Sequence, residues 1–199
     1  MITIIDYGMG NLRSVQKALE HVGAKAKITQ NHKDIDKAVK IVLPGVGAMQ
    51  PAYDKLKSLY LIEPIKNFIS KNKPFLGICL GLQLLFEESD EGQNTKGLGI
   101  LKGNVNKFTK LKIPQMGWNQ IIIKNRDCKI FKGIDDLANV YFCHSYFANP
   151  KDKNDIASTT SYGREFASSV NKENIFGVQF HPEKSQKIGL KILENFTKI

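Results

Sequence analysis

The chain has 199 residues, of which 42% are hydrophobic and 24% charged, and its formal net charge is +10. This length and composition predict one globular domain, residues 1–199, with a substantial core. The 29 Lys and Arg residues are scattered along the chain rather than gathered in a basic run, so the charge pattern does not predict nucleic-acid binding. It indicates a solvated basic surface or a surface for an acidic protein partner.

The N-terminal segment and the cysteines indicate the compartment. Met1–Asp6 lacks the basic and apolar segments typical of a signal peptide, and no apolar run reaches the length of a membrane span. The three cysteines, Cys79, Cys128 and Cys143, have no metal-ligand spacing and are odd in number. We expect a cytoplasmic protein with free thiols, no metal and no contact with a membrane.

The first half of the chain alternates strands and helices. Short apolar segments predict strands at 2–5, 26–29 and 40–43 and another that begins at Phe75. Helical spacing of apolar residues predicts helices at 11–22, 35–39, 53–59 and 64–70. This alternation is typical of a parallel sheet with helices on both faces.

The second half changes to short strands separated by Gly, Asn and Asp. The predicted strands are 98–101, 105–108, 119–123, 140–144, 156–161, 166–170 and 175–180, and a closing helix covers 185–197. The sequence therefore predicts an α/β fold: an open, mostly parallel sheet with helices on both faces and an antiparallel or mixed flank.

The segment Gly77-Ile78-Cys79-Leu80-Gly81 lies between a predicted strand and the start of a helix. A nucleophile flanked by glycines two residues away on each side is typical of a nucleophile elbow, here with Cys in place of Ser. A Cβ on either glycine would collide with neighbouring backbone, and the helix N-terminus favours a thiolate. The alternative is a buried structural cysteine beside ordinary glycines.

A second segment, His181-Pro182-Glu183, directly follows the last predicted strand. A cysteine nucleophile needs a base, and the base needs a group that orients it. The carboxyl ends of strands are where open α/β sheets place their chemistry. The sequence therefore predicts a catalytic triad of Cys79, His181 and Glu183.

Together these two segments resemble the class I (triad) glutamine amidotransferases. Further segments are similar to one subfamily, the glutaminase subunits of imidazole glycerol phosphate synthase. They are residues 6–12, 43–48, 114–119, 144–146 and 181–186. The resemblance implies hydrolysis of glutamine to glutamate and ammonia, with no metal or organic cofactor.

The resemblance also implies roles around the triad. Backbone N–H groups of the Val46–Gly47 loop and of Leu80 would form the oxyanion hole, and the peptide between Gly45 and Val46 could rotate at low cost because glycine is permissive. Four residues would surround the bound glutamine: Gly47, Gln83, Ser145 and Tyr146.

The resembled subfamily passes its ammonia to a synthase (cyclase) subunit, similar to a (β/α)₈ barrel, within a heterodimer. The partner makes imidazole glycerol phosphate and aminoimidazole carboxamide ribotide in histidine biosynthesis. A Met-Gly-Trp-Asn loop, residues 116–119, would face this partner. The residues implied at the interface are Asn11, Trp118, Tyr141, Lys184 and Gln186.

One residue departs from the subfamily, which usually has His where this chain has Gln115. Three alternatives stay open. A paralogous glutaminase could supply ammonia to a sugar-amidinating synthetase. A cysteine hydrolase could act on esters or γ-glutamyl peptides without a partner, and an interaction module could retain a vestigial site.

Overall fold

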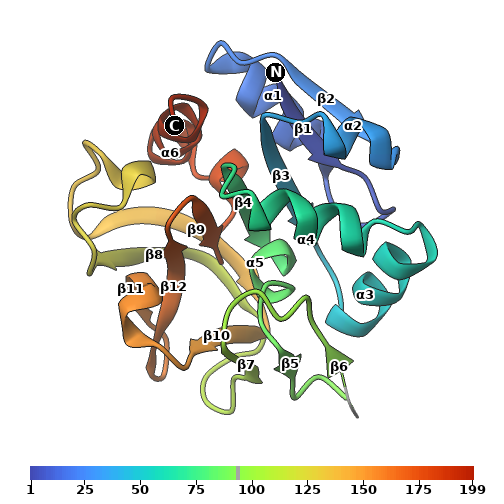
Figure 1. Ribbon diagram of the computed structural model, residues 1–199. Coiled ribbons are helices and arrows are strands. Elements are labelled where there is room, and N and C mark those ends of the chain that lie inside the picture. The colour runs from blue at the N-terminus through green and yellow to red at the C-terminus, as the bar shows by residue number, and fades with distance from the viewer. Residues whose placement is uncertain (93–94) are drawn as a thin grey trace.

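The computed structural model describes residues 1–92 and 95–199. Its centre is a parallel sheet of five strands in the order β2-β1-β3-β4-β13 (Figure 1). These strands are β1 (Ile2–Ile5), β2 (Ala26–Thr29), β3 (Lys40–Gly45), β4 (Phe75–Cys79) and β13 (Ile175–Val178). The C-terminal strand β13 thus lies beside β4, which places residues that follow Cys79 by about 100 positions next to it.

Helices cover both faces of this sheet, as the alternating pattern predicts. One face packs against α1 (Leu12–His21) and α6 (Gln186–Thr197). The other packs against α2 (His32–Asp36), α3 (Met49–Ser58), α4 (Ile62–Ser70) and the short α5 (Leu80–Gln83). Successive side chains of a strand point to opposite faces, so Ile41 and Val42 enter different cores.

The flank beyond β13 is mixed, which confirms the prediction. The path continues through β12 (Glu165–Lys172), β10 (Tyr146–Pro150) and β7 (Gly103–Lys107) to the short β5 (Glu88–Ser89) and β6 (Thr95–Lys96). A branch leaves β12 through β11 (Ile156–Ser161), β8 (Gln115–Ile123) and β9 (Ala138–His144). Single 3₁₀ turns lie at Lys129–Phe131, Lys153–Asp155 and Pro182–Lys184.

The strand predicted at 98–101 is wrong. The backbone N–H groups of Leu98 and Ile100 instead donate to the carbonyls of Leu84 and Leu85, at 2.7 and 2.9 Å. Carbonyls at the end of a helix have no partner within it. This segment therefore caps α5 and the turn after it.

Three helices begin earlier than predicted, and one of them is α4, which starts at Ile62 instead of 64. The side chain of Asn31 accepts from the N–H of Lys33 at 2.9 Å and starts α2 at His32, instead of 35. In α3, the carboxylate of Glu91 accepts from the N–H of Met49 at 2.6 Å, so the helix starts there and not at 53. That capping group comes from 42 positions away in the sequence.

Most strands of the second half also differ from the prediction at one or both ends, and three differences bear on the site. Met116 and its neighbours to 119 lie within β8, paired with β9, and not in a loop. Strand β10 was not predicted, and it exists because Tyr146–Pro150 pairs with β7. The last parallel strand ends at Val178 instead of 180, because the chain bends there toward His181.

Candidate functional site

Cys79 lies where β4 meets α5, with backbone angles of φ +53° and ψ −104°. A positive φ is strained for a residue with a side chain, and such strain is typical of a nucleophile elbow. Cys79 is 5% exposed, and it reaches solvent through a pocket.

The flanking glycines are sterically required. A Cβ on Gly77 would lie 2.5 Å from the carbonyl oxygen of Gly81. A Cβ on Gly81 would overlap the carbonyl oxygen of Leu43 on β3. The predicted collision on both sides of the cysteine is confirmed, and it explains how α5 can start directly on the sheet.

His181 and Glu183 lie beside Cys79. The ring Nδ1 of His181 is 2.8 Å from Oε1 of Glu183, and the two side chains are 4% and 2% exposed. The Cys79 side chain lies close enough to His181 to raise the pKa of its imidazole. The structure therefore brings together the three residues that the sequence predicts as a triad.

The electrostatics of His181 favour a protonated ring. Burial lowers its pKa, but the hydrogen bond to Glu183, the nearby Cys79 sulfur and the charges of both groups outweigh burial and raise the pKa from 6.5 to about 10. In the described part of the chain no donor reaches Oε2 of Glu183, which is buried, so the carboxylate charge acts mainly on the imidazole. His181 can therefore hold a proton at neutral pH.

A pocket of about 290 Å³ opens over the cysteine. It is lined by all the predicted oxyanion and glutamine-binding residues: Val46, Gly47, Leu80, Gln83, Ser145 and Tyr146. Gly47 has φ +100°, and Gly45 is paired with Cys79 across β3 and β4. The loop after β3 is thus directly beside the nucleophile.

The residues at the site that were missed from the sequence include Glu91 and Gln179. Glu91 lines the pocket and caps α3. Gln179 is fully buried and donates from Nε2 to Cys79 Sγ at 3.6 Å. The available signal for Gln179 was its place two residues before His181, on a strand predicted to lie near Cys79. Glu91 carried no local signal.

Gln115, the departure from the subfamily, contacts a buried histidine. Oε1 of Gln115 lies 2.9 Å from Nε2 of His144, and Nδ1 of His144 lies 2.7 Å from the carbonyl of Tyr146. That carbonyl can only accept, so a neutral His144 donates from Nδ1 and its Nε2 must accept. The Gln115 side-chain amide, whose oxygen and nitrogen are exchanged by a flip, then donates to Nε2 through its NH₂ group. Burial lowers the pKa of His144 to about 4, against a smaller rise from the Tyr146 carbonyl.

The residues expected at the partner interface separate into two groups. Trp118 and Tyr141 pack edge to face with ring centroids 6.0 Å apart, and Nζ of Lys184 lies 5.8 Å from the Tyr141 ring. We call these three residues the aromatic–lysine patch. Asn11 accepts from the N–H of Ser14 as the cap of α1, and Gln186 is the exposed first residue of α6.

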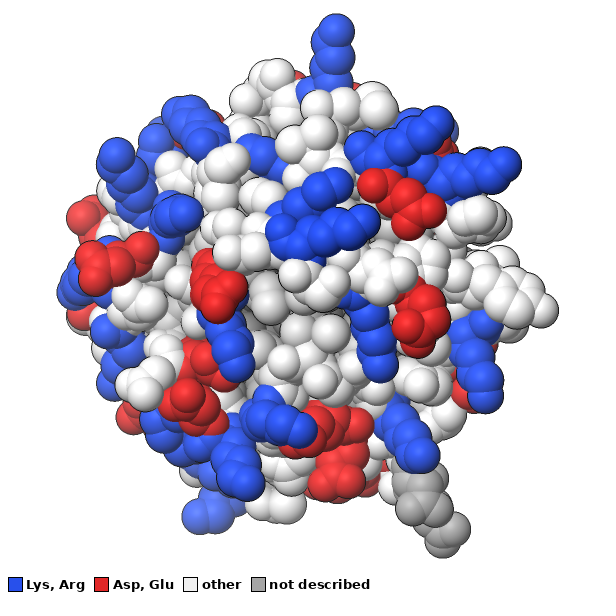
Figure 2. Space-filling view, viewed as in Figure 1, with Lys and Arg blue, Asp and Glu red and all other residues white. Residues whose placement is uncertain are grey.

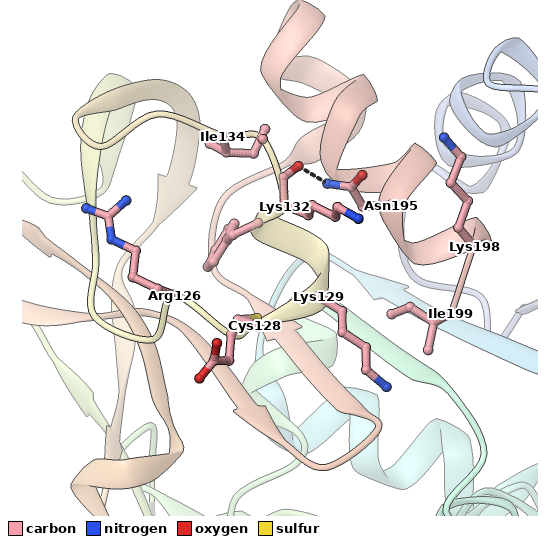
Figure 3. Close-up of a pocket in the computed structure, with 11 residues that line it drawn as sticks. Arg126, Cys128, Lys129, Lys132, Ile134, Asn195, Lys198 and Ile199 are labelled. Atoms are coloured by element: carbon pink, nitrogen blue, oxygen red, sulfur yellow. Dashed lines mark hydrogen bonds between the residues drawn. The ribbon is translucent and has the colours of Figure 1, made fainter.

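A larger pocket, about 530 Å³, lies elsewhere, near the end of α6 (Figure 3). The side-chain NH₂ group of the buried Asn195 donates to the carbonyls of Ile130 and Lys132, and Figure 3 shows the second of these bonds. Burial raises the pKa of the Cys128 thiol to about 12, so this cysteine stays protonated at neutral pH. The pocket has none of the nucleophile chemistry seen at Cys79.

Figure 2 shows a face on which Lys and Arg side chains are dispersed among acidic and uncharged ones. Within residues 1–92 and 95–199, no group of three His, Cys, Asp or Glu side chains is arranged to hold a metal ion. None of the helices described is long and apolar enough to cross a membrane.

The fold is similar to that of known structures. The structure of PurLQS from Thermotoga maritima superposes with a TM-score of 0.76. The match covers 99% of this chain and 97% of the PurLQS chain, at 20% sequence identity. This likeness supports the fold class alone.

Sequence comparisons are more specific. The family model for Glutamine amidotransferase class-I matches residues 3–199. The imidazole glycerol phosphate synthase subunit HisH of Caldanaerobacter subterraneus subsp. tengcongensis is 53% identical over 197 residues, covering 98% of this chain and 97% of the relative. The protein of the same name from Methanocaldococcus jannaschii is 52% identical over 200 residues, with 100% of both chains covered. The chain therefore belongs to the class-I glutamine amidotransferases and, within them, to the HisH subunits of imidazole glycerol phosphate synthase.

Proposed function

We propose that this chain hydrolyses glutamine through Cys79, His181 and Glu183. The Cys79 thiolate attacks the side-chain carboxamide carbon of glutamine, and the C–N bond breaks as His181 gives its proton to the departing ammonia. Water, deprotonated by His181, then cleaves the γ-glutamyl thioester, which releases glutamate and restores the thiol. Glu183 keeps the His181 ring oriented and stabilises its protonated form.

The observation that carries this proposal is the strained elbow. Cys79 at φ +53° faces a histidine whose second nitrogen is 2.8 Å from a buried carboxylate. Nucleophile, base and orienting group are the parts that covalent amide hydrolysis requires. A vestigial site would not need to retain this geometry.

The pocket offers groups that suit glutamine. Leu80 and the Val46–Gly47 loop line the pocket beside Cys79, and their backbone N–H groups would stabilise the oxyanion when turned toward it. Glu91 is the only acidic residue among the described residues of the lining, and its carboxylate fits the α-ammonium group of the substrate. Gly47, Gln83, Ser145 and Tyr146 surround the remaining space.

The ammonia is passed to a synthase partner. Relatives at about half identity over their full length are subunits of imidazole glycerol phosphate synthase, which favours histidine biosynthesis over a sugar-amidinating synthetase. The partner that we propose is a (β/α)₈ barrel cyclase, bound as a heterodimer in the cytoplasm. Trp118 is 48% exposed, and with Lys184 it offers an aromatic anchor and a charge for that surface.

The nucleophile is tested by Cys79→Ala. In the complex with the synthase, we expect glutamine-dependent synthesis to fall by several powers of ten, because the triad acts as a unit. Synthesis with added ammonium should stay near the wild-type rate, because the partner carries out that step. Cys128→Ala is the matched control and should keep both activities. Glutamine-dependent turnover that survives in Cys79→Ala would rule out the proposal.

Recognition of the substrate is tested by Glu91→Gln. Loss of the negative charge should raise the KM for glutamine by about tenfold or more, since a charge-assisted hydrogen bond is stronger than a neutral one. The side-chain amide oxygen of the glutamine introduced at position 91 can still accept from the N–H of Met49, so α3 keeps its N-terminal cap. A KM equal to that of wild type would show that another group binds the ammonium.

A further inference from the structure

Gln179 is a fully buried amide directly beside the nucleophile. It follows the last paired residues of two neighbouring parallel strands, where Val178 lies opposite Ile78. Gln179 and Cys79 are therefore the next residues at the carboxyl ends of β13 and β4. The side-chain Nε2 of Gln179 donates to Cys79 Sγ at an N···S distance of 3.6 Å.

The orientation of this amide is fixed by its neighbours. The Tyr146 carbonyl can only accept, so the NH₂ group of Gln83, 3.1 Å away, must face it. The same NH₂ group donates to Oε1 of Gln179, also at 3.1 Å. The remaining NH₂ group of Gln179 must then point toward the sulfur.

The two protonation states of the sulfur use different contacts. As a thiol, Cys79 can donate to the carbonyl of Cys143, a long contact of 3.9 Å. A thiolate cannot donate, but it accepts from Gln179, and the positive charge of a protonated His181 nearby stabilises it. An N–H donor aimed at a buried sulfur therefore favours the anionic form.

We propose that Gln179 is a further catalytic residue, whose side-chain N–H stabilises the Cys79 thiolate and holds the sulfur in position for attack. Gln83 acts through Gln179 as a positioning residue. This inference rests on the proposed function, because it takes Cys79 as the nucleophile. It adds to the triad a neutral hydrogen-bond donor, which reaches the sulfur from the residue that follows β13.

The test measures alkylation of Cys79 by iodoacetamide, whose carboxamide resembles the glutamine side chain. The rate at pH 7 is followed by mass spectrometry of the Cys79 peptide in wild type, Gln179→Met and Gln179→Asn. Methionine keeps the length of the side chain but removes the N–H donor, and asparagine withdraws the amide by one methylene. Gln16→Met is the matched control, because Gln16 donates to Ala26 O away from the site.

We expect both Gln179 variants to be alkylated about tenfold more slowly at pH 7, the order of effect of losing one hydrogen bond to a charged group. The difference in alkylation rate between wild type and the Gln179 variants should become smaller at high pH, where Cys79 is a thiolate in every protein. In the complex, kcat for glutamine should fall by a similar factor with KM nearly unchanged, because Gln179 does not line the pocket. Gln16→Met should match wild type throughout.

Thermal melting shows which variants are folded, and Gln179→Asn carries the test if Gln179→Met does not fold. An alkylation rate within about twofold of wild type in a folded variant would overturn the role of Gln179. Glutamine turnover in Cys79→Ala is measured beside it. An inactive Cys79→Ala with unaffected Gln179 variants refutes this inference alone, whereas an active Cys79→Ala refutes the proposed function.

Discussion

Two histidines at the site have opposite electrostatics, although both are buried. His181 has a carboxylate and the Cys79 sulfur as neighbours, and its pKa is raised to about 10. His144 has a backbone carbonyl and an amide, and its pKa is lowered to about 4. Neighbouring anions, rather than burial, therefore decide which histidine can serve as an acid.

The lowered pKa of His144 predicts a pH dependence of stability. A group whose folded pKa lies below its unfolded value of 6.5 contributes stability above that value, which is lost as the pH falls toward 4. One pH unit of separation corresponds to about 1.4 kcal/mol, so roughly 3 kcal/mol should be lost between pH 7 and pH 4. Urea unfolding of wild type and of His144→Gln at both pH values isolates this contribution.

The glutamine variant cannot take up a proton, so its free energy of unfolding should fall less steeply with acid than that of wild type. Asn67→Gln serves as a control, since Asn67 is exposed on α4 and neither side chain takes up a proton, so the slope should stay unchanged. Parallel slopes for wild type and His144→Gln would contradict the buried, neutral state of His144.

At the scale of single residues, the sequence predicts the triad but not the residues that contact and support it. Cys79, His181 and Glu183 lie in short motifs whose spacing carries the chemistry. Gln179 and Glu91 act across contacts that join segments 100 and 42 positions apart. Such contacts depend on which strands become neighbours, which local spacing does not specify.

At the scale of elements, the elbow depends on how closely α5 approaches β3. Gly81 on α5 lies against the carbonyl oxygen of Leu43, with no room for a Cβ. Gly81→Ala should therefore lower the free energy of unfolding by about 3 kcal/mol, the upper end of the cost of overpacking. It should also reduce glutaminase activity, because Cys79 moves with the elbow.

The matched control is Gly8→Ala. Gly8 has φ +84° but no atom within 4 Å of a Cβ, so only the backbone strain of about 1 kcal/mol should appear. Chemical unfolding of both variants separates steric overlap from strain. An equal decrease in the free energy of unfolding of both variants would show that a Cβ at position 81 causes no steric overlap between α5 and β3.

Hydrophobic periodicity predicts most helices and strands. The exceptions depend on contacts between segments that are far apart in the sequence. The strands 2–5, 26–29 and 156–161 have the predicted bounds, because alternating or continuous apolar residues define them. Leu98–Leu101 has a similar apolar composition but caps α5 instead. Met116–Asn119 has the glycine and polar residues of a loop, yet pairing with β9 makes it a strand.

At the scale of the whole molecule, the aromatic–lysine patch is joined to the triad by backbone. The N–H of His181 donates to the carbonyl of Tyr141 at 2.9 Å. The Ser185 hydroxyl donates to the carbonyl of His181 and accepts from the N–H of Tyr141, at 2.6 and 2.9 Å. A partner that docks on Trp118 and Lys184 would therefore contact residues packed against Tyr141, which is hydrogen-bonded to His181.

This arrangement predicts that the isolated chain binds glutamine but hydrolyses it poorly. The loop from Gly45 to Gly47 can rest with its N–H turned away from the pocket, and a missing oxyanion donor costs roughly 10²–10³ in rate. Docking of the synthase with its nucleotide substrate should favour the rotated peptide and raise turnover by about that factor. The partner's substrate then controls when ammonia is released.

The measurement is glutamate release from the chain alone, with the synthase, and with the synthase plus its nucleotide substrate. Trp118→Ala and Lys184→Met should weaken the increase, because they remove the anchor and the charge of the patch, whereas Lys57→Met, exposed on α3, should not. Since none of these residues lines the pocket, basal turnover of the isolated variants should equal that of wild type. Equal rates in all three conditions would mean that the oxyanion hole is formed without the partner and that the glycine loop is only a turn.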